Sequence, residues 1–123
     1  MFQGLFGNAS EIDSKDIQKE LNDLLIEGET MIRGFKVIRD LFIFTDKRLV
    51  LVDKQGISGK KVEYHSIPYR SISHFSLETA GTFDFDSELK IYISGNPVPY
   101  QREFKKGSDV LGVQKMLAQC VLK

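Results

Sequence analysis

Two short runs of the sequence, residues 41–44 and 49–52, are apolar at every position: they read Leu-Phe-Ile-Phe and Leu-Val-Leu-Val. An antiparallel strand that packs on a core with one face and meets water with the other alternates apolar and polar residues. Two neighbouring strands that are apolar on both faces therefore need a second layer over their outer side. A helix of the same chain or a second copy of the chain could supply that layer, and both could apply.

Segments that follow these two runs do alternate. Residues 62–65, 74–78 and 89–94 place apolar and polar side chains in turn, as half-buried antiparallel strands do. Turn-forming residues such as Gln55-Gly56-Ile57-Ser58-Gly59 recur at short intervals between them. The spacing predicts a mainly β domain with seven short antiparallel strands in a barrel or sandwich over residues 29–105, at 29–39, 41–45, 48–54, 60–67, 72–79, 87–94 and 99–105.

A helix is predicted on each side of the strands, and both lie within one domain spanning residues 1–123. The first covers residues 10–27, with Ser10 or Ser14 as its N-cap, and places four apolar residues on one face: Ile17, Leu21, Leu24 and Leu25. The second covers residues 108–122 and starts at Ser108 or Asp109. Its apolar face consists of Val110, Val113, Leu117, Cys120 and Val121, and we expect it to plug an open end of the barrel.

The charge balance excludes one broad class of function. The chain of 123 residues has 17 Lys plus Arg against 17 Asp plus Glu, so its formal net charge is zero. Proteins that bind nucleic acids usually carry a basic excess, and so do polybasic membrane anchors. We therefore expect neither a nucleic acid nor a membrane lipid as the principal partner. Cys120 is the only cysteine, and the first residues lack the pattern of a secretory signal, so we expect a cytoplasmic protein.

The residues that most often carry chemistry form no recognisable site. His65 and His74 are the only histidines and fall on different predicted strands, with no cysteine or carboxylate at ligand spacing. Cys120 lies on an apolar helix face, where a cysteine is usually a small buried hydrophobe. The acidic residues at positions 84, 86 and 88 resemble the start of a calcium-binding loop. Such a loop needs glycine at its sixth position and glutamate at its twelfth, where this sequence has Leu89 and Gly95. We predict no enzyme activity, no cofactor and no metal.

Five basic residues are the candidate binding residues. Arg33, Lys36 and Arg39 belong to the first predicted strand, and Lys47-Arg48 follow the turn after the second. They could form a patch for an acidic or phosphorylated partner. Such residues are more often solvated residues that protect strand edges from aggregation, and the zero net charge favours that interpretation.

Several stretches of the sequence together form a recognisable pattern: residues 4–10 (Gly-Leu-Phe-Gly-Asn-Ala-Ser), the stretch from Thr45-Asp46-Lys47-Arg48-Leu49 to Lys60-Lys61, Ser66-Ile67-Pro68-Tyr69-Arg70-Ser71-Ile72, Glu78-Thr79-Ala80-Gly81, and Asp84 with Asp86-Ser87-Glu88-Leu89. In these stretches the sequence resembles a family of short bacterial proteins of unknown function with a pleckstrin-homology-like domain. The resemblance covers nearly the whole chain. The resemblance implies a pleckstrin-homology-like seven-stranded barrel without enzyme activity or cofactor. It also implies cyclic homo-oligomers that bind an unidentified protein, and the number of copies that it suggests is five.

Relatives that bind inositol phosphates use basic residues around a long loop between the first two strands. Here Asp40 directly follows Arg39 and the second strand begins at Leu41, so that loop is minimal. We therefore predict a non-catalytic interaction module that acts as a cyclic homo-oligomer. Binding of phosphoinositide or acidic-lipid headgroups at the membrane surface, through the five basic residues, is the alternative.

Overall fold

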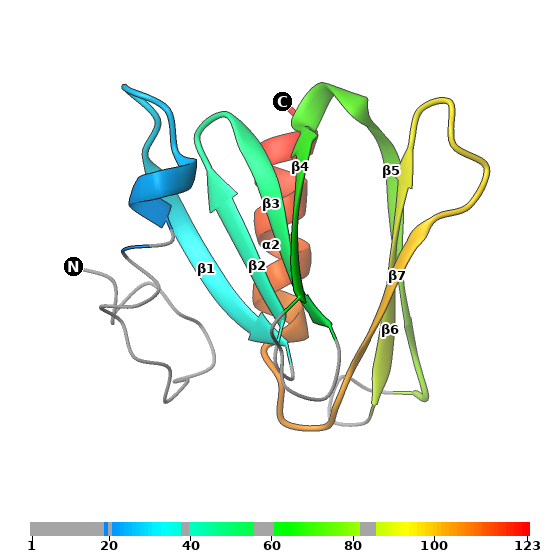
Figure 1. The fold of residues 1–123 in the computed structure, drawn as a ribbon. Helices are drawn as coiled ribbons and strands as arrows, with labels where there is room; N and C mark the ends of the chain where they lie inside the picture. Colours follow the sequence, from blue (N-terminus) through cyan, green and yellow to red (C-terminus); the bar gives the residue numbers. More distant parts are fainter. Residues whose placement is uncertain (1–18, 20, 38–39, 56–60, 82–85) are drawn as a thin grey trace.

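The computed structural model describes residues 19, 21–37, 40–55, 61–81 and 86–123, which form seven strands, a 3₁₀ turn and a C-terminal helix (Figure 1). Strands β1 to β4 form one antiparallel sheet in sequence order, and β5 to β7 form a second. The bounds are β1 Met31–Val37, β2 Asp40–Thr45, β3 Arg48–Gln55, β4 Lys61–Pro68, η2 Tyr69–Ser71, β5 Ile72–Thr79, β6 Ser87–Ile93, β7 Tyr100–Phe104 and α2 Val110–Val121. The mainly β pleckstrin-homology-like fold predicted from the sequence is confirmed.

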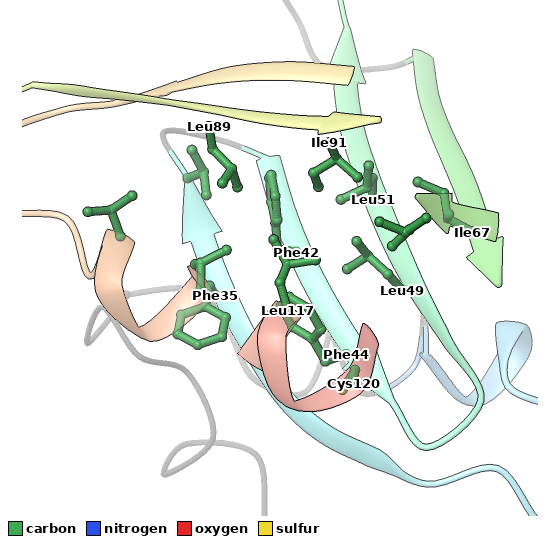
Figure 2. Packing of buried hydrophobic residues seen from close by; sticks show 14 of the residues in the cluster. Phe35, Phe42, Phe44, Leu49, Leu51, Ile67, Leu89, Ile91, Leu117 and Cys120 are labelled. Carbon is green, nitrogen blue, oxygen red and sulfur yellow. The ribbon is translucent and has the colours of Figure 1, made fainter. Parts of the chain in front are cut away.

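The space between the two sheets holds the larger of two hydrophobic clusters (Figure 2). Phe42 and Phe44 of β2 point inward, and the rings of Phe42 and Phe104 meet edge to face with centroids 5.7 Å apart. We call this set the inner cluster; its buried members are Phe35, Val37, Phe42, Phe44, Leu49, Leu51, Ile67, Ile72, Leu89, Ile91, Phe104, Val110, Val113, Leu117 and Cys120. Every strand contributes at least one of them, so the inner cluster joins both sheets.

The outer side of the four-stranded sheet is also buried. Register pairs Leu41 with Val52 and Ile43 with Val50, so these four side chains share the face opposite to the inner cluster. Each is at most 1% exposed. We call the set Leu21, Met31, Leu41, Ile43, Val50 and Val52 the outer cluster. In the two runs that are apolar at every position, alternate side chains therefore belong to the inner cluster and to the outer cluster.

The N-terminal segment supplies the cover that these strands required. Residues 21–24 are helical, and the Leu25 N–H donates to the Leu21 carbonyl at 2.8 Å. Leu21 is buried in the outer cluster, and Leu24 and Leu25 pack against it. Ile17 and most of the predicted helix over residues 10–27 lie outside the described residues.

The C-terminal helix packs at one end of the space between the sheets, as predicted. Its buried face consists of Val110, Val113, Leu117 and Cys120. Figure 2 shows Leu117 and Cys120 pointing toward Phe44. The helix is shorter than the predicted 108–122 because Asp109 is its N-cap, and its carboxylate accepts the Gly112 N–H at 3.0 Å.

Strand boundaries agree with the prediction to within two residues, apart from positions 38–39 and 60, which lie outside the described residues. The largest difference is at β1, which begins at Met31 and not at residue 29. Thr30 donates its N–H to the carboxylate of Asp46 at 2.8 Å, and the Glu29 side chain turns inward to Arg48. Residues 29 and 30 therefore form hydrogen bonds with the side chains of Arg48 and Asp46, and strand β1 begins only after them.

Candidate functional site

Arg48, at the start of β3, is held by a buried carboxylate. Its Nε lies 2.8 Å from Glu29 Oε2, and its Nη2 lies 2.9 Å from Glu29 Oε1, which is a two-point ion pair. The guanidinium also donates to Ser66 Oγ at 2.8 Å and to the Leu24 carbonyl at 2.9 Å. Arg48 therefore ties the N-terminal segment to β3 and β4, and its charge is neutralised within the fold.

The carboxylate of Glu29 is held in its charged form. Burial by itself raises the pKa of Glu29, but donors around it more than offset that effect. Arg48 donates twice, the Thr45 hydroxyl donates at 2.6 Å and the Ile26 N–H donates at 3.1 Å. Together with the charge of Arg48 they lower the pKa from 4.5 to about 2. Glu29 is therefore the anionic centre of a structural network.

The β2–β3 turn is fixed by the same hydroxyl. Thr45 Oγ accepts the backbone N–H of Lys47 at 3.1 Å and that of Arg48 at 3.0 Å. The Tyr69 hydroxyl, from η2, donates to the Thr45 carbonyl at 2.6 Å. Burial raises the pKa of Tyr69, so this hydroxyl stays protonated and keeps donating. The turn and η2 are thereby joined side by side at one end of the molecule.

Two hollows lie beside each other at this joined end. Each has a volume of about 360 Å³, and they share Lys47, Pro68 and Arg70 as a common wall. The first is completed by Ile26, Glu29, Arg48 and Ser66. The second is completed by Asp46, Tyr69, Cys120, Val121 and Lys123. We call these two hollows the basic double hollow.

The cations of the shared wall form no ion pair with any residue that the structure describes. Lys47 and Arg70 are exposed, and no described carboxylate lies within ion-pair distance of either. Lys123 adds a third cation to the second hollow. The carboxylate of Asp46 is the counter-charge in this lining, and it already accepts the Thr30 N–H. The basic double hollow therefore presents more positive than negative charge to a ligand.

Comparisons with known proteins identify the family. The model of the family described as "Bacterial PH domain" matches residues 1–121. The chain belongs to the bacterial PH domain family. It is 58% identical over 116 residues to the uncharacterized protein YjqA of Bacillus subtilis (strain 168), covering 94% of this chain and 93% of that protein.

Two solved structures agree with this assignment. A pleckstrin homology domain from Shewanella amazonensis SB2B is 54% identical, with a TM-score of 0.82, over 95% of this chain and 94% of that one. A protein of the DUF1696 family with a pleckstrin-homology domain, from Shewanella loihica PV-4, is 50% identical, with a TM-score of 0.75, over 91% of this chain and 96% of that one. The predicted resemblance to bacterial pleckstrin-homology-like proteins is confirmed.

This bacterial PH domain does not gather the described candidate basic residues into one patch. Arg33 lies on the inner side of β1, where it stacks over the Phe35 ring at 4.9 Å and lies 3.7 Å from the Asp109 carboxylate. Lys36 pairs with Leu41 and so lies on the opposite face, toward the other end of β1. Arg39 lies outside the described residues. Lys47 and Arg48 are neighbours, but Arg48 is paired with Glu29, whereas Lys47 has no ion-pair partner among the described residues.

Two cations of the basic double hollow, Arg70 and Lys123, were not among the candidates. Arg70 lies in the short η2 turn, and Lys123 follows α2. The contact between Tyr69 and Thr45, 24 residues apart, brings η2 beside Lys47. Pro68-Tyr69-Arg70 is part of the sequence that carries the family resemblance. The tyrosine beside Arg70 was the sequence signal that could have placed this arginine next to the β2–β3 turn.

The other chemically capable side chains are far from this surface or have structural roles. His74 stacks on Tyr92 with ring centroids 4.1 Å apart, while His65 contacts Tyr100 from the other sheet. Cys120 is 7% exposed, which confirms that it is a small buried hydrophobe. Within the described ranges, no three His, Cys, Asp or Glu side chains converge as a metal site. No helix described here is long and apolar enough to span a bilayer.

The outer face of the second sheet carries the opposite charge. Register places Glu88 directly between Glu78 of β5 and Glu103 of β7. Like charges on adjacent strands repel, and here Lys105 offsets part of the repulsion by pairing with Glu103 at 3.1 Å. We call Glu78, Glu88 and Glu103 the glutamate row.

Proposed function

We propose that this bacterial PH domain is a non-catalytic, cytoplasmic protein-interaction module that acts as a cyclic homo-oligomer. The PH family is generally non-catalytic, which supports the absence of enzyme activity. The observation that carries the oligomer is a pair of open strand edges. The edge strands are β1 and β4 in one sheet and β5 and β7 in the other. Strands β4 and β5 are the longer edge of each, with eight residues against seven in β1 and five in β7.

The edge at β5 is incompletely covered. Phe75 and Leu77 face the inner cluster but are only half-buried. Their register partners on β6, Ile91 and Leu89, are 1% exposed. An additional strand alongside β5 would cover these two side chains and satisfy the backbone groups of the free edge.

The sequence of β5 does little to prevent such pairing. Edge strands usually carry lysines, prolines or inward-pointing charges that block association with other chains. The β5 sequence, Ile-Ser-His-Phe-Ser-Leu-Glu-Thr, has a single charged residue, Glu78. Pairing of this edge with a different edge of the next copy is a head-to-tail contact, and such contacts close into rings when the rotation permits. We propose five copies, the number suggested by the family resemblance.

A ring gives a weak binding surface a functional advantage. Several copies of one surface, held side by side, convert later binding events into intramolecular ones at high effective concentration. A protein without catalytic residues can therefore bind a multivalent protein partner tightly.

The experiment is size exclusion coupled to light scattering at micromolar concentration. We expect a mass several times that of the 14.0 kDa chain, with five copies as the proposed number. Phe75→Lys puts an inward charge on the β5 edge and should shift the mass toward one chain, whereas Phe75→Leu should keep the assembly. A mass of one chain for the unsubstituted protein, constant on dilution, contradicts the ring.

Binding of phosphoinositide or acidic-lipid headgroups remains the alternative function. It would use Arg33, Lys36, Arg39, Lys47 and Arg48, but the four described members of this set are separated by fold position or by internal pairing. Strong, salt-sensitive flotation with anionic vesicles would support it.

A further inference from the structure

We propose that the basic double hollow binds an acidic peptide segment of a partner protein, in which an apolar side chain lies between carboxylates. This inference rests on one part of the proposed function, namely that the partner is a protein. It adds the location of the site and the chemistry of the segment recognised.

The charges favour carboxylates. Lys47 and Arg70 lie on the wall shared by both hollows. One carboxylate in the first hollow and another in the second could therefore each contact one of these two cations. Neither cation has a described carboxylate partner within the chain. The negative charge of Glu29 is matched by Arg48, which lies in the same hollow. The unmatched charge at the surface is therefore positive.

The apolar atoms favour a segment that also carries a hydrophobic side chain. Ile26 is 60% exposed and lines the first hollow beside Pro68. Val121, at the end of α2, lines the second. A bare phosphate would leave these surfaces in water, whereas an aliphatic or aromatic side chain would remove them from it.

The surface is already rigid before a ligand arrives. The Thr45 hydroxyl accepts the N–H of Lys47, and the Tyr69 hydroxyl fixes η2, which carries Arg70, to the Thr45 carbonyl. Both cations therefore project from a backbone that hydrogen bonds hold in place. Little ordering of the backbone is needed on binding, so a short segment retains more of its interaction energy.

The same observations argue against a densely charged anion or an anionic membrane. Asp46 places a carboxylate in the lining of the second hollow, where it would repel a compact polyphosphate. Elsewhere on the domain the glutamate row opposes adsorption to an anionic surface, and the net charge is zero. Spaced carboxylates on a peptide fit these constraints best.

The test measures fluorescence anisotropy with a labelled peptide in which Leu-Phe is flanked on each side by three glutamates. Three comparison peptides replace the glutamates by glutamines, replace Leu-Phe by Ser-Ser, or keep the composition in scrambled order. The proteins are the unsubstituted full chain, Lys47→Glu/Arg70→Glu, and the control Lys61→Glu/Lys115→Glu, which makes the same charge change at exposed residues outside the double hollow. Circular dichroism and thermal melting verify that each variant folds.

We expect the acidic Leu-Phe peptide to bind the unsubstituted protein and to lose at least tenfold in affinity with Lys47→Glu/Arg70→Glu. The control should change by less than threefold. The glutamine and serine peptides should each bind at least fivefold more weakly. If Lys47→Glu/Arg70→Glu fails to fold, Lys47→Gln/Arg70→Gln replaces it, with at least a threefold loss expected.

Three results would overturn the inference. One is the absence of binding by the acidic Leu-Phe peptide, and another is an equal loss in the control variant. The third is binding of phosphatidylserine vesicles that Lys47→Glu/Arg70→Glu abolishes while peptide binding is unaffected, which would assign the surface to a membrane. Light scattering separates this inference from the proposed ring. A ring that does not bind the peptide would refute the peptide site alone. A monomer that binds the peptide would refute the ring alone.

Discussion

The two sheets of this domain differ in how many faces they bury. In the four-stranded sheet, Leu51 faces the inner cluster and Val50 the outer one, and each is at most 1% exposed. In the three-stranded sheet, Leu89 and Ile91 are buried, whereas Lys90 between them lies on the outer face. The central strands of the four-stranded sheet are therefore covered on both faces. The three-stranded sheet is covered on one face only, and its outer face is solvated.

The largest effect is expected at the layer that both sheets share. Phe42 contacts the rings of Phe104 and Tyr100 across the space between the sheets. Phe42→Ala should lower the free energy of unfolding by about 3–5 kcal/mol, because it removes a fully buried ring and leaves a cavity. Urea unfolding measures the loss, with Phe42→Leu as a milder control. A loss below 1 kcal/mol would show that the two sheets are not packed as one core.

The next effect tests the second buried face. Leu21→Ala should lower the free energy of unfolding by about 2–4 kcal/mol, since Leu21 is 1% exposed in the outer cluster. Leu24 is only half-buried, so Leu24→Ala should lose less, about 1–2 kcal/mol. The exposed Asn22→Ala serves as the control. Unchanged melting of both leucine variants would mean that the N-terminal segment is a free tail and the outer face is covered by something else.

The third effect depends on pH and concerns the tie between the N-terminal segment and the four-stranded sheet. The folded state lowers the pKa of Glu29 to about 2, so folding favours its charged form. The stabilisation is complete above the unfolded value of about 4.5 and is lost as the pH falls toward 2. It amounts to about 3 kcal/mol, since each pKa unit corresponds to about 1.4 kcal/mol.

Urea unfolding at several pH values should show this loss in the unsubstituted protein and a smaller one in Glu29→Gln. Glu103→Gln, on the exposed face of the other sheet, is the matched control. Identical pH dependence in Glu29→Gln and the unsubstituted protein would remove Glu29 from the explanation.

The smallest effects are expected on the outer face of the three-stranded sheet. Lys90→Ala and Ser76→Ala should each change the free energy of unfolding by no more than about 0.5 kcal/mol, because no cluster covers these side chains. Differential scanning calorimetry measures this. A loss above 1.5 kcal/mol at either position would reveal a second layer on this face and erase the contrast between the sheets.

The fold was predictable from the sequence to a large extent, because it follows from local periodicity. The alternation of apolar and polar residues predicted the strands that have one solvated face. The two runs that are apolar at every position predicted a second layer over the sheet, to which Leu21, Leu24 and Leu25 contribute. The start of β1 was missed because Glu29 is held by Arg48, 19 residues away, and such a pairing leaves no periodic signal.

The candidate site was much less predictable. Lys47 and Arg48 are adjacent in sequence, yet Arg48 is neutralised by Glu29 while Lys47 has no carboxylate partner in the described part of the chain. Arg70 and Lys123 reach Lys47 only through tertiary structure, since they belong to different elements. A single sequence shows which cations are neighbours along the chain, but it does not show which already have a carboxylate partner.

The order of the strands has a consequence for how the chain folds during synthesis. Each strand pairs with the one before or after it within its own sheet, so every hairpin can form as soon as its two strands have been made. The inner cluster, however, includes Val110, Val113 and Leu117 of α2, the last of the described elements to be synthesised. Until that helix emerges from the ribosome, the nascent sheets expose one end of their shared apolar interior. That interval is when the chain is most exposed to aggregation and to capture by chaperones.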